Sequence, residues 1–434
     1  MIRVGFALQQ VVHDLRVGML LRPLVILGGS GALALAVTHA ERAHPGAFAW
    51  ARPLGVVDVS SAQVVLGTIA GSMLTLLALV YSVFLVAMTL VSMQFSPRGL
   101  STLTRDPLTQ TSFGMLAGTF LYALLVLRAV HGDPDAYVAP LGVALAITLA
   151  VASITTLLTF LHHISQEIQA NTLIAGLADA TREVLAEEFS EEPPLPTAPC
   201  PSPFAPVPDG AAAITLARSG YIQLLDVEGV LERARQAGVE IVLARAVGEY
   251  VVEGVTVGYV RGPGAAAVAL AIRDDFDLGA VRTLQQDAEY GVRRIVDIGL
   301  KAISPAVNDP STGVTCVDNL TSLLAFVATR RDPARELPAG EGKVVLARTT
   351  FARLVALAFT QLRQYAQGDM AVSLRLMRAL HDLASLTREP SRTAALRAEA
   401  ELLRAGISGD FGEGDRAELS RRADALLAAL DRTA

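Results

Sequence analysis

The stretch VVLGTIAGSMLTLLALVYSVFLVAMTLVSM, residues 64–93, decides the fold class of this chain. It is apolar along its whole length and contains no Asp, Glu, Lys or Arg. Because a helix rises about 1.5 Å per residue, about 20 apolar residues cross the ~30 Å hydrocarbon core of a bilayer, and this run is longer than that. The sequence therefore predicts a membrane-spanning helix here.

Three further apolar runs accompany this one, at residues 23–40, 113–130 and 139–161. Only 18% of the chain is charged, whereas soluble domains have roughly 25%, and the charged residues concentrate after residue 164. We therefore predict a four-helix transmembrane domain over residues 1–165. The expected fold class is a multi-pass α-helical membrane protein with a cytoplasmic α+β domain.

The orientation of the predicted helices follows from the arginines in the short loops. One side of the membrane would carry five and the other three: Arg3, Arg16, Arg22, Arg98 and Arg105 against Arg42, Arg52 and Arg128. The positive-inside rule places the side with more arginines in the cytoplasm. We expect a cell membrane protein with both termini cytoplasmic.

The predicted helix at 64–93 carries hydroxyl side chains on one face, at Thr68, Ser72, Thr75, Ser82 and Thr89. Their spacing gathers them within about 100° of arc. In lipid, such residues mark helix–helix packing. Alternatively, copies of this face line a polar pore in a homo-oligomer, and the sequence leaves both interpretations open.

Two other features bear on the membrane half. No Asp, Glu or Lys lies within the four apolar runs, which argues against a proton-coupled transporter, because its relay needs such a group. Gly114 and Gly118 form a small-xxx-small pair, which is typical of helix packing. The lipid bilayer is the first expected partner.

The rest of the chain divides by pattern. Residues 166–188 predict a helical extension and residues 189–212 a proline-rich linker. Residues 213–274 are rich in β-branched residues and predict a small β-barrel or sandwich. Its expected strands are 214–217, 220–225, 239–246, 250–260 and 267–273, with a helix at 227–236. Residues 275–434 predict a helical cytoplasmic domain, whose first helix runs from 280 to 303.

That first helix supplies a candidate cytoplasmic site. Its polar stripe and the turn after it comprise Asp287, Arg294, Asp297, Lys301, Asn308 and Asp309. The charges can form a solvated ladder of pairs three and four residues apart, and Asp309 can cap the next helix. Alternatively, the carboxylates and the Asn hold a ligand or a divalent cation through oxygen atoms.

Composition and motifs exclude several classes of function. A net charge of −6 argues against a nucleic-acid partner. Cys200 and Cys316 have no CxxC spacing, so neither a disulfide framework nor a zinc site is indicated. The chain contains no nucleophile elbow, phosphate loop or HExxH motif. We therefore nominate no catalytic residue and no cofactor, and the metal, if any, is unassigned.

Four segments resemble a bacterial family of predicted membrane proteins catalogued as domain of unknown function 2254. They are SMQFSPRGLSTLTRDPLTQ (92–110), FGMLAGTFLYALLVLRAV (113–130), LHHISQEIQ (161–169) and DAEYGVRRIVDIGLKAISPAVNDPSTGVTCVDNL (287–320). The resemblance covers nearly the whole chain, and AISPAVNDPST (302–312) is its most specific part. It implies the membrane class and a bacterial source, and it implies no activity.

The residues favour a homo-oligomeric channel or transport-like pore with a cytoplasmic regulatory domain. Alternatives are a membrane-tethered enzyme or a ligand or metal sensor with its site near Asp287, Asp297, Asn308 and Asp309, or a membrane scaffold.

Overall fold

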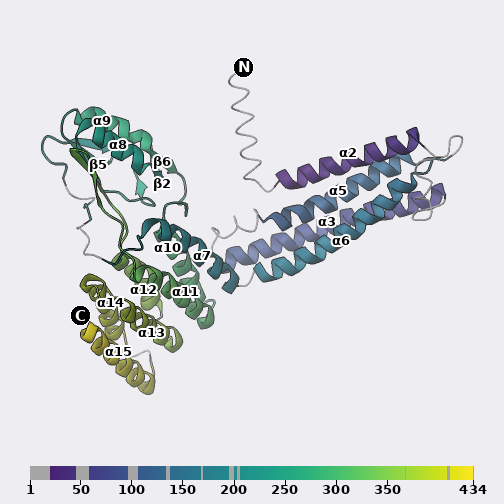
Figure 1. Cartoon of the computed structure of the whole chain (residues 1–434). Helices are drawn as coiled ribbons and strands as arrows, with labels where there is room; N and C mark the ends of the chain where they lie inside the picture. Colours follow the sequence, from purple (N-terminus) through teal and green to yellow (C-terminus); the bar gives the residue numbers. More distant parts are fainter. Residues whose placement is uncertain are drawn as a thin grey trace. The chain divides into compact units, whose positions relative to one another are not determined.

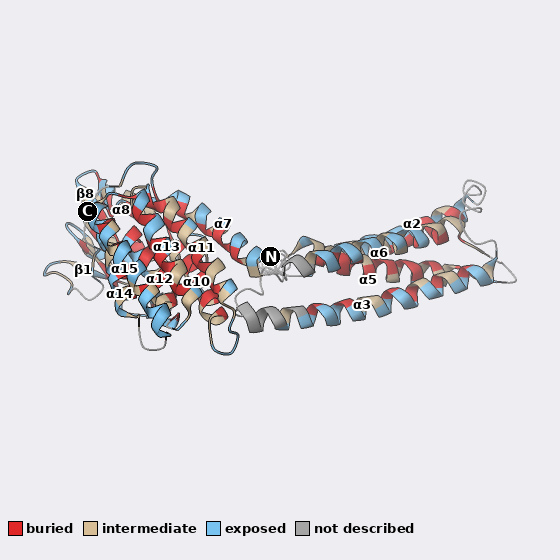
Figure 2. Cartoon of the chain, turned by 90° about the horizontal axis from the view of Figure 1, so that it is seen from below, coloured by how far each residue is buried: buried red, intermediate tan, exposed pale blue. Residues whose placement is uncertain are grey.

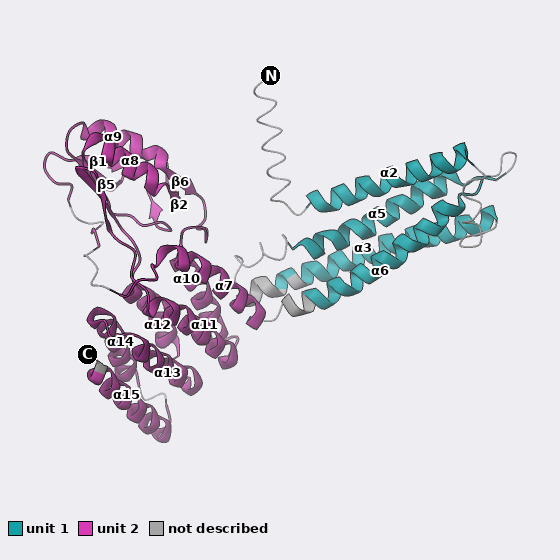
Figure 3. Ribbon diagram, viewed as in Figure 1, with its two compact units in different colours: residues 1–170 teal, residues 171–434 magenta. Residues whose placement is uncertain are grey.

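The computed structural model describes residues 20–44, 58–95, 106–132, 137–167, 170–194, 200–202, 206–366, 368–407 and 411–433. The chain divides into two compact units, residues 1–170 (unit 1) and 171–434 (unit 2) (Figure 3). The predicted proline-rich linker lies partly outside the described residues. Residues 168 and 169 of the predicted helical extension also lie outside them.

Unit 1 is a bundle of long helices (Figure 1). They are α2 (Leu21–Ala43), α3 (Val59–Phe95), α5 (Pro107–Ala129) and α6 (Pro140–Glu167). Helix α5 contacts each of the other three. A Cβ added at Gly114 would lie 3.0 Å from the Pro23 Cα atom, and one at Gly118 would lie 3.2 Å from Ser30 Cβ. The packing role predicted for this glycine pair is therefore confirmed, because the glycines let α2 approach α5 closely.

Five of the described helices are long and apolar enough to cross a membrane, judged by length and composition alone. Four belong to unit 1, and each of them overlaps one of the four predicted runs. The fifth is α11 (Pro310–Ala328) in unit 2, which was predicted as part of a helical domain and not as a span. It packs against α10 (Ala288–Ala302), α12 (Phe351–Tyr365) and α13 (Met370–Leu386). It also carries Asp318, which forms an ion pair with Arg375 of α13.

The β-rich part of unit 2 forms two sheets from its described strands. One has the order β1-β5-β3-β8-β7 and the other β4-β2-β6. The strands are β1 (Ala212–Thr215), β2 (Gly220–Leu225), β3 (Glu240–Leu243), β4 (Tyr250–Val251), β5 (Thr256–Arg261), β6 (Phe276–Gly279), β7 (Glu336–Ala339) and β8 (Gly342–Leu346). The core between them includes Ile214, Ile241 and Val344, all fully buried.

Of the two arrangements expected for this region, a small barrel or a sandwich, the barrel is wrong, because the described strands form two sheets that do not close into a barrel. Strand β3 pairs in parallel with β8, whose residues come about a hundred positions later in the chain, and the remaining described pairs are antiparallel. The hairpin β7–β8 and strand β6 therefore come from the stretch that was expected to be helical. A parallel pair needs a long crossover, and here the chain from α10 to α11 supplies part of it.

Two predicted elements within unit 2 also need correction. The strand expected at 267–273 is helix α9 (Ala265–Ala271) followed by a 3₁₀ turn (Ile272–Asp275). Its sequence AAAVALA favours a helix, because alanine has the highest intrinsic helix propensity. The helix expected from residue 280 begins as α10 at Ala288, because the Asp287 side chain accepts a hydrogen bond from Tyr290 N, at 2.9 Å, and caps it.

The other helices of unit 2 complete its core. They are α7 (Ala170–Glu188), α8 (Val227–Ala237), α14 (Pro390–Ala405) and α15 (Glu413–Thr433). Helix α7 approaches α10 where Gly291 lies against the side chain of Thr181, which is fully buried. This close contact holds the end of α7 near the start of α10, and that arrangement positions the cavity described below.

Candidate functional site

The predicted hydroxyl residues of α3 all lie on an exposed face of unit 1. Thr68, Ser72, Thr75, Ser82 and Thr89 are exposed, and Figure 2 shows the exposed residues along α3 in pale blue. The buried side of the helix carries Leu66, Met73, Val80 and Phe84 instead. At about 100° per residue, these two sets point in roughly opposite directions. Unit 1 alone therefore leaves the hydroxyl face of α3 uncovered.

The threonine hydroxyls on this face are already bonded within the helix. Those of Thr68, Thr75 and Thr89 donate to the carbonyl oxygens four residues earlier, at 2.7, 2.9 and 2.8 Å. Gly67 and Gly71 lie beside them, and a Cβ added at either would meet nothing within 4 Å. The face is therefore shallow and has satisfied hydroxyls, so a second helix can approach it without stranding a threonine donor.

Sequence analysis missed one acidic residue of unit 1, because the first apolar run was ended at residue 40. Helix α2 extends to Ala43, and Glu41 on it is only 4% exposed. Its Oε1 accepts a hydrogen bond from Leu141 N, at 2.7 Å, in the first turn of α6. Among the described residues, its Oε2 has no hydrogen-bond partner. Glu41 therefore caps α6 from another helix. The sequence feature that could have revealed it is a single Glu at the end of an apolar run.

The structure separates the residues of the predicted cytoplasmic site. Asp287 precedes α10, whereas Asn308 and Asp309 follow its C-terminal end, and a helix of 15 residues is about 22 Å long. Asp297 forms an ion pair with Arg293 at 2.9 Å, one turn away. The Arg294 guanidinium lies over the Tyr290 ring, 5.8 Å from its centre. The backbone carbonyl oxygen of Lys301 accepts a hydrogen bond from the Ser304 hydroxyl. The six residues therefore occupy different turns of α10 and its flanks.

The Asn308–Asp309 turn has a visible structural role. Asp309 accepts hydrogen bonds from Thr312 N at 3.1 Å and from the Thr312 hydroxyl at 2.6 Å, which caps α11 and lowers the pKa of the carboxyl. Asn308 adopts a φ of 51°, the left-handed region that Asn tolerates better than most residues. The backbone N–H of Asn308 donates to Ser304 O at 2.8 Å. A ligand role for this turn remains a hypothesis.

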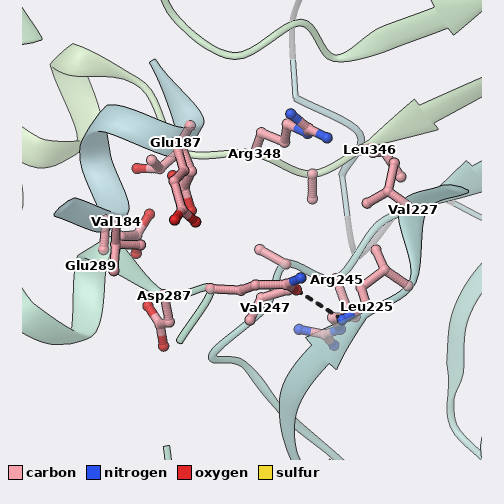
Figure 4. Close-up of a pocket in the computed structure, with 16 residues that line it drawn as sticks. Val184, Glu187, Leu225, Val227, Arg245, Val247, Asp287, Glu289, Leu346 and Arg348 are labelled. Carbon is pink, nitrogen blue, oxygen red and sulfur yellow. Dashed lines mark hydrogen bonds between the residues drawn. The ribbon is translucent and has the colours of Figure 1, made fainter. Parts of the chain in front are cut away.

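A cavity of about 240 Å³ lies within unit 2, and of the six predicted residues only Asp287 lines it (Figure 4). Its wall is built from the end of α7, the segments after β2, β3 and β8, and the start of α10. Arg245 follows β3, and Arg348 follows β8. Because β3 and β8 are parallel neighbours, their carboxyl ends meet at one edge, where ligands of mixed sheets commonly bind.

A close approach of the backbone shapes one wall of the cavity. Gly248 has a φ of 87°, and a Cβ added there would overlap the Asp287 carboxylate. Asp287 is itself held by Arg282, whose Nε and Nη2 donate to it at 2.8 Å each. Burial raises the pKa of Asp287, while its bonds with Arg282 oppose that rise. The Asp287 carboxylate is therefore already bonded within the protein, to Arg282 and to Tyr290 N.

The other charges at the cavity differ in whether they have partners. Glu289 forms an ion pair with Arg353 at 2.5 Å, and Arg245 pairs with Glu249 at 3.3 Å. Glu188 and Arg348 are the exceptions. Over the part of the chain that the structure describes, neither has a salt bridge within 4.0 Å. One carboxyl and one guanidinium therefore line the cavity without direct neutralisation.

The pKa values of Glu188 and Arg348 agree with their lack of salt bridges among the described residues. Burial raises the pKa of Glu188 to about 7; Arg348 opposes the rise, and Asp287, Glu289 and Glu187 add to it. Burial also lowers the pKa of Arg348. Thr349, next in the chain, is 9% exposed, and its hydroxyl has no hydrogen-bond partner among the described residues. Buried polar groups without partners are uncommon and call for an explanation.

These three residues were missed by sequence analysis. Glu188 ends α7, whereas Arg348 and Thr349 follow a strand that pairs late in the chain, and no local motif links them. Within the described residues, no group of three or more His, Cys, Asp and Glu side chains is arranged to hold a metal ion. What the cavity offers chemically is a cation, a carboxyl and a free hydroxyl, which suits the binding of a small polar molecule.

Comparison with known proteins agrees with the prediction of a membrane protein. A family model described as "Predicted membrane protein (DUF2254)" matches residues 16–382. Two mycobacterial proteins, uncharacterized protein Mb1321c of Mycobacterium bovis and uncharacterized protein Rv1290c of Mycobacterium tuberculosis, are each 32% identical over 374 residues, which is 82% of this chain and 70% of theirs. No solved structure matches. The chain therefore belongs to the DUF2254 family of predicted membrane proteins.

Proposed function

We propose that this protein is a homo-oligomeric channel or transport-like pore, lined by the hydroxyl face of α3 and regulated by unit 2. The observation that carries the proposal is the exposure of Thr68, Ser72, Thr75, Ser82 and Thr89 in the isolated chain. A helix that meets only lipid has no need for a face of hydroxyls and glycines. Copies arranged around an axis would give that face a partner.

The positions of the glycines suit such an assembly. Gly67 and Gly71 lie roughly 40–80° around α3 from the centre of the hydroxyl face. A neighbouring copy can therefore pack against the glycines while the hydroxyls turn toward the axis. Since close approach and dispersion drive association in lipid, open glycines favour a helix–helix contact. Polar pore linings of Ser and Thr would then let small hydrated species pass.

Four spans and cytoplasmic termini are part of the same proposal. The arginine asymmetry supports this orientation. Helix α11 is apolar enough to span, but Asp318 on it pairs with Arg375, and its neighbours α10, α12 and α13 are amphipathic. We therefore assign α11 to unit 2 and place that unit in the cytoplasm.

The test is to measure oligomer size and ion flux for the wild type and for Ser82→Leu. In a pore, the larger apolar side chain blocks flux while the oligomer stays intact. In a packing face, it overfills a close contact and the oligomer dissociates. Val83→Leu is the control for side-chain size, because Val83 is also exposed and lies about 100° around the helix from Ser82, just beyond the edge of the hydroxyl face. A monomeric wild type, or a Ser82→Leu variant with unchanged flux, would contradict the pore.

A second candidate is a membrane-tethered ligand sensor without a pore. The cavity with Glu188, Arg348 and Thr349 favours it, because a binding site needs no flux. Ligand binding by a protein that gives no flux in liposomes would select this alternative. Its mechanism would then act through partners or through the shape of unit 2.

A further inference from the structure

We infer that the cavity of unit 2 is a binding site for a small zwitterion, a molecule that carries both an ammonium group and a carboxylate. Arg348 and Thr349 would hold the carboxylate, and Glu188 with its neighbour Glu187 would hold the ammonium group. The inference goes beyond the proposed pore, because binding at this site does not depend on transport.

The anion-binding side rests on two adjacent groups. Arg348 lines the cavity with no carboxylate within salt-bridge distance among the described residues. A guanidinium donates to a carboxylate in a planar, two-pronged fashion, so it is the side chain best suited to this task. Thr349 lines the same cavity and is nine-tenths buried, and its hydroxyl has no hydrogen-bond partner among the described residues. A ligand oxygen beside Arg348 would satisfy both groups together.

The ammonium-binding side is the last turn of α7. Glu187 and Glu188 line the cavity, and the structure records no ion pair for either within its described part. Burial raises the pKa of Glu188, and the charge of Arg348 only partly offsets that rise. An ammonium group between the two glutamates would supply the missing charge.

The balance of charges selects a zwitterion over simpler ligands. Asp287, Glu289 and Arg245 are already paired with Arg282, Arg353 and Glu249, so they do not need a ligand. A plain anion would satisfy Arg348 and add a third negative charge near the glutamates. A plain cation would leave Arg348 and Thr349 without partners. Only a ligand with both charges serves all of the unpaired groups.

The size of the cavity limits the ligand. A volume of about 240 Å³ is larger than the ~150 Å³ that holds a benzene molecule, so on the order of ten non-hydrogen atoms would fit. Amino acids and short ω-amino acids have this size.

The test is calorimetric titration of the full-length protein in detergent with glycine, γ-aminobutyrate and 6-aminohexanoate. These probes differ in the distance between the two charges. Butyrate and butylamine, which carry one charge each, are the ligand controls. We expect at least one zwitterion to bind saturably and at least about tenfold more tightly than either control, since a charged hydrogen bond is lost in each control.

Variants then assign the contacts. Arg348→Gln and Glu188→Gln should each weaken zwitterion binding by about tenfold to a hundredfold, whereas Arg378→Gln, on an exposed turn of α13, should not change it. Thr349→Val is the sharpest variant. It should weaken binding about threefold to tenfold without lowering the melting temperature of the ligand-free protein, because it removes a hydroxyl that no described residue bonds to.

Three results would overturn the inference. The first is that none of the three zwitterions binds, and the second is that butyrate or butylamine binds as tightly as they do. The third is that Arg348→Gln binds like the wild type. None of these results depends on ion flux, so failure here is distinguishable from failure of the pore.

Discussion

Replacing Glu188 by Gln should make the ligand-free protein more stable, and the gain should depend on pH. The pKa of Glu188 is raised from its ordinary value of 4.5 to about 7 in the folded chain, mainly by burial. Between these two pH values the folded state keeps a proton that the unfolded state releases. Stability is therefore lost as the pH rises through this window, and the full penalty is present above pH 7.

The magnitude follows from the size of that pKa change. Raising a carboxyl pKa from 4.5 to about 7 corresponds to about 3 kcal/mol between the two protonation states, and this is an upper value because the charges of Arg348 and Asp287 are coupled to Glu188. For a unit of this size, about 3 kcal/mol raises the melting temperature by roughly 6–12 °C. Glu188→Gln should show such a gain at pH 8 and almost none at pH 4.

The assay is differential scanning calorimetry of the full chain in detergent at pH 4, 5, 6, 7 and 8. Glu183→Gln is the matched control, because Glu183 is exposed one turn earlier on the same helix α7. It should shift the melting temperature little, and equally at each pH. If the difference between Glu188→Gln and the wild type is the same at pH 4 and pH 8, the burial argument for Glu188 is refuted.

Three further predictions concern other parts of the chain. Glu41→Ala should destabilise unit 1 by about 1 kcal/mol or more, because Leu141 N loses its acceptor, while Glu41→Gln should retain most of the stability; equal melting temperatures would rule out the cap. Asp309→Ser and Asp309→Asn keep an oxygen for Thr312 N, so a purely structural turn predicts near-parental melting temperature, oligomer size and flux, whereas lost flux with the fold retained would mark a site. In intact cells, an impermeant thiol reagent should label Gly132→Cys in a Cys200→Ala background and leave the exposed native Cys200 of the wild type unlabelled; the reverse pattern would invert the proposed topology.

The membrane class could be predicted from the sequence because its signal is local. A run such as 64–93 needs no partner to show that it is apolar, and the glycines at 114 and 118 show their packing role by spacing alone. Most helices of unit 2 also carry local signals, including an Asp cap and a proline at the start of α11. The fold class, the hydroxyl face of α3 and the family resemblance all come from patterns of this kind.

Contacts between segments that are far apart in the sequence could not be predicted from such local patterns. The pairing of β3 with β8 joins strands about a hundred residues apart, and it forms a mixed sheet in the region where a small barrel or sandwich was expected. Asp287 looked like part of a helix until its bonds with Arg282 and Tyr290 N showed it to be a cap. Strand propensity likewise failed at α9, where an alanine-rich segment folds as a helix against the sheet.

The sequence by itself determined that this chain enters a membrane, which of its helix faces are polar, and to which family it belongs. Only the tertiary structure decided that the hydroxyl face of α3 is left uncovered by unit 1 and that Glu188, Arg348 and Thr349 meet at one cavity. The physical reason is that hydropathy and periodicity report the surroundings of one segment. A binding site depends on which charges are neutralised by residues far away in the chain, and only the fold sets that.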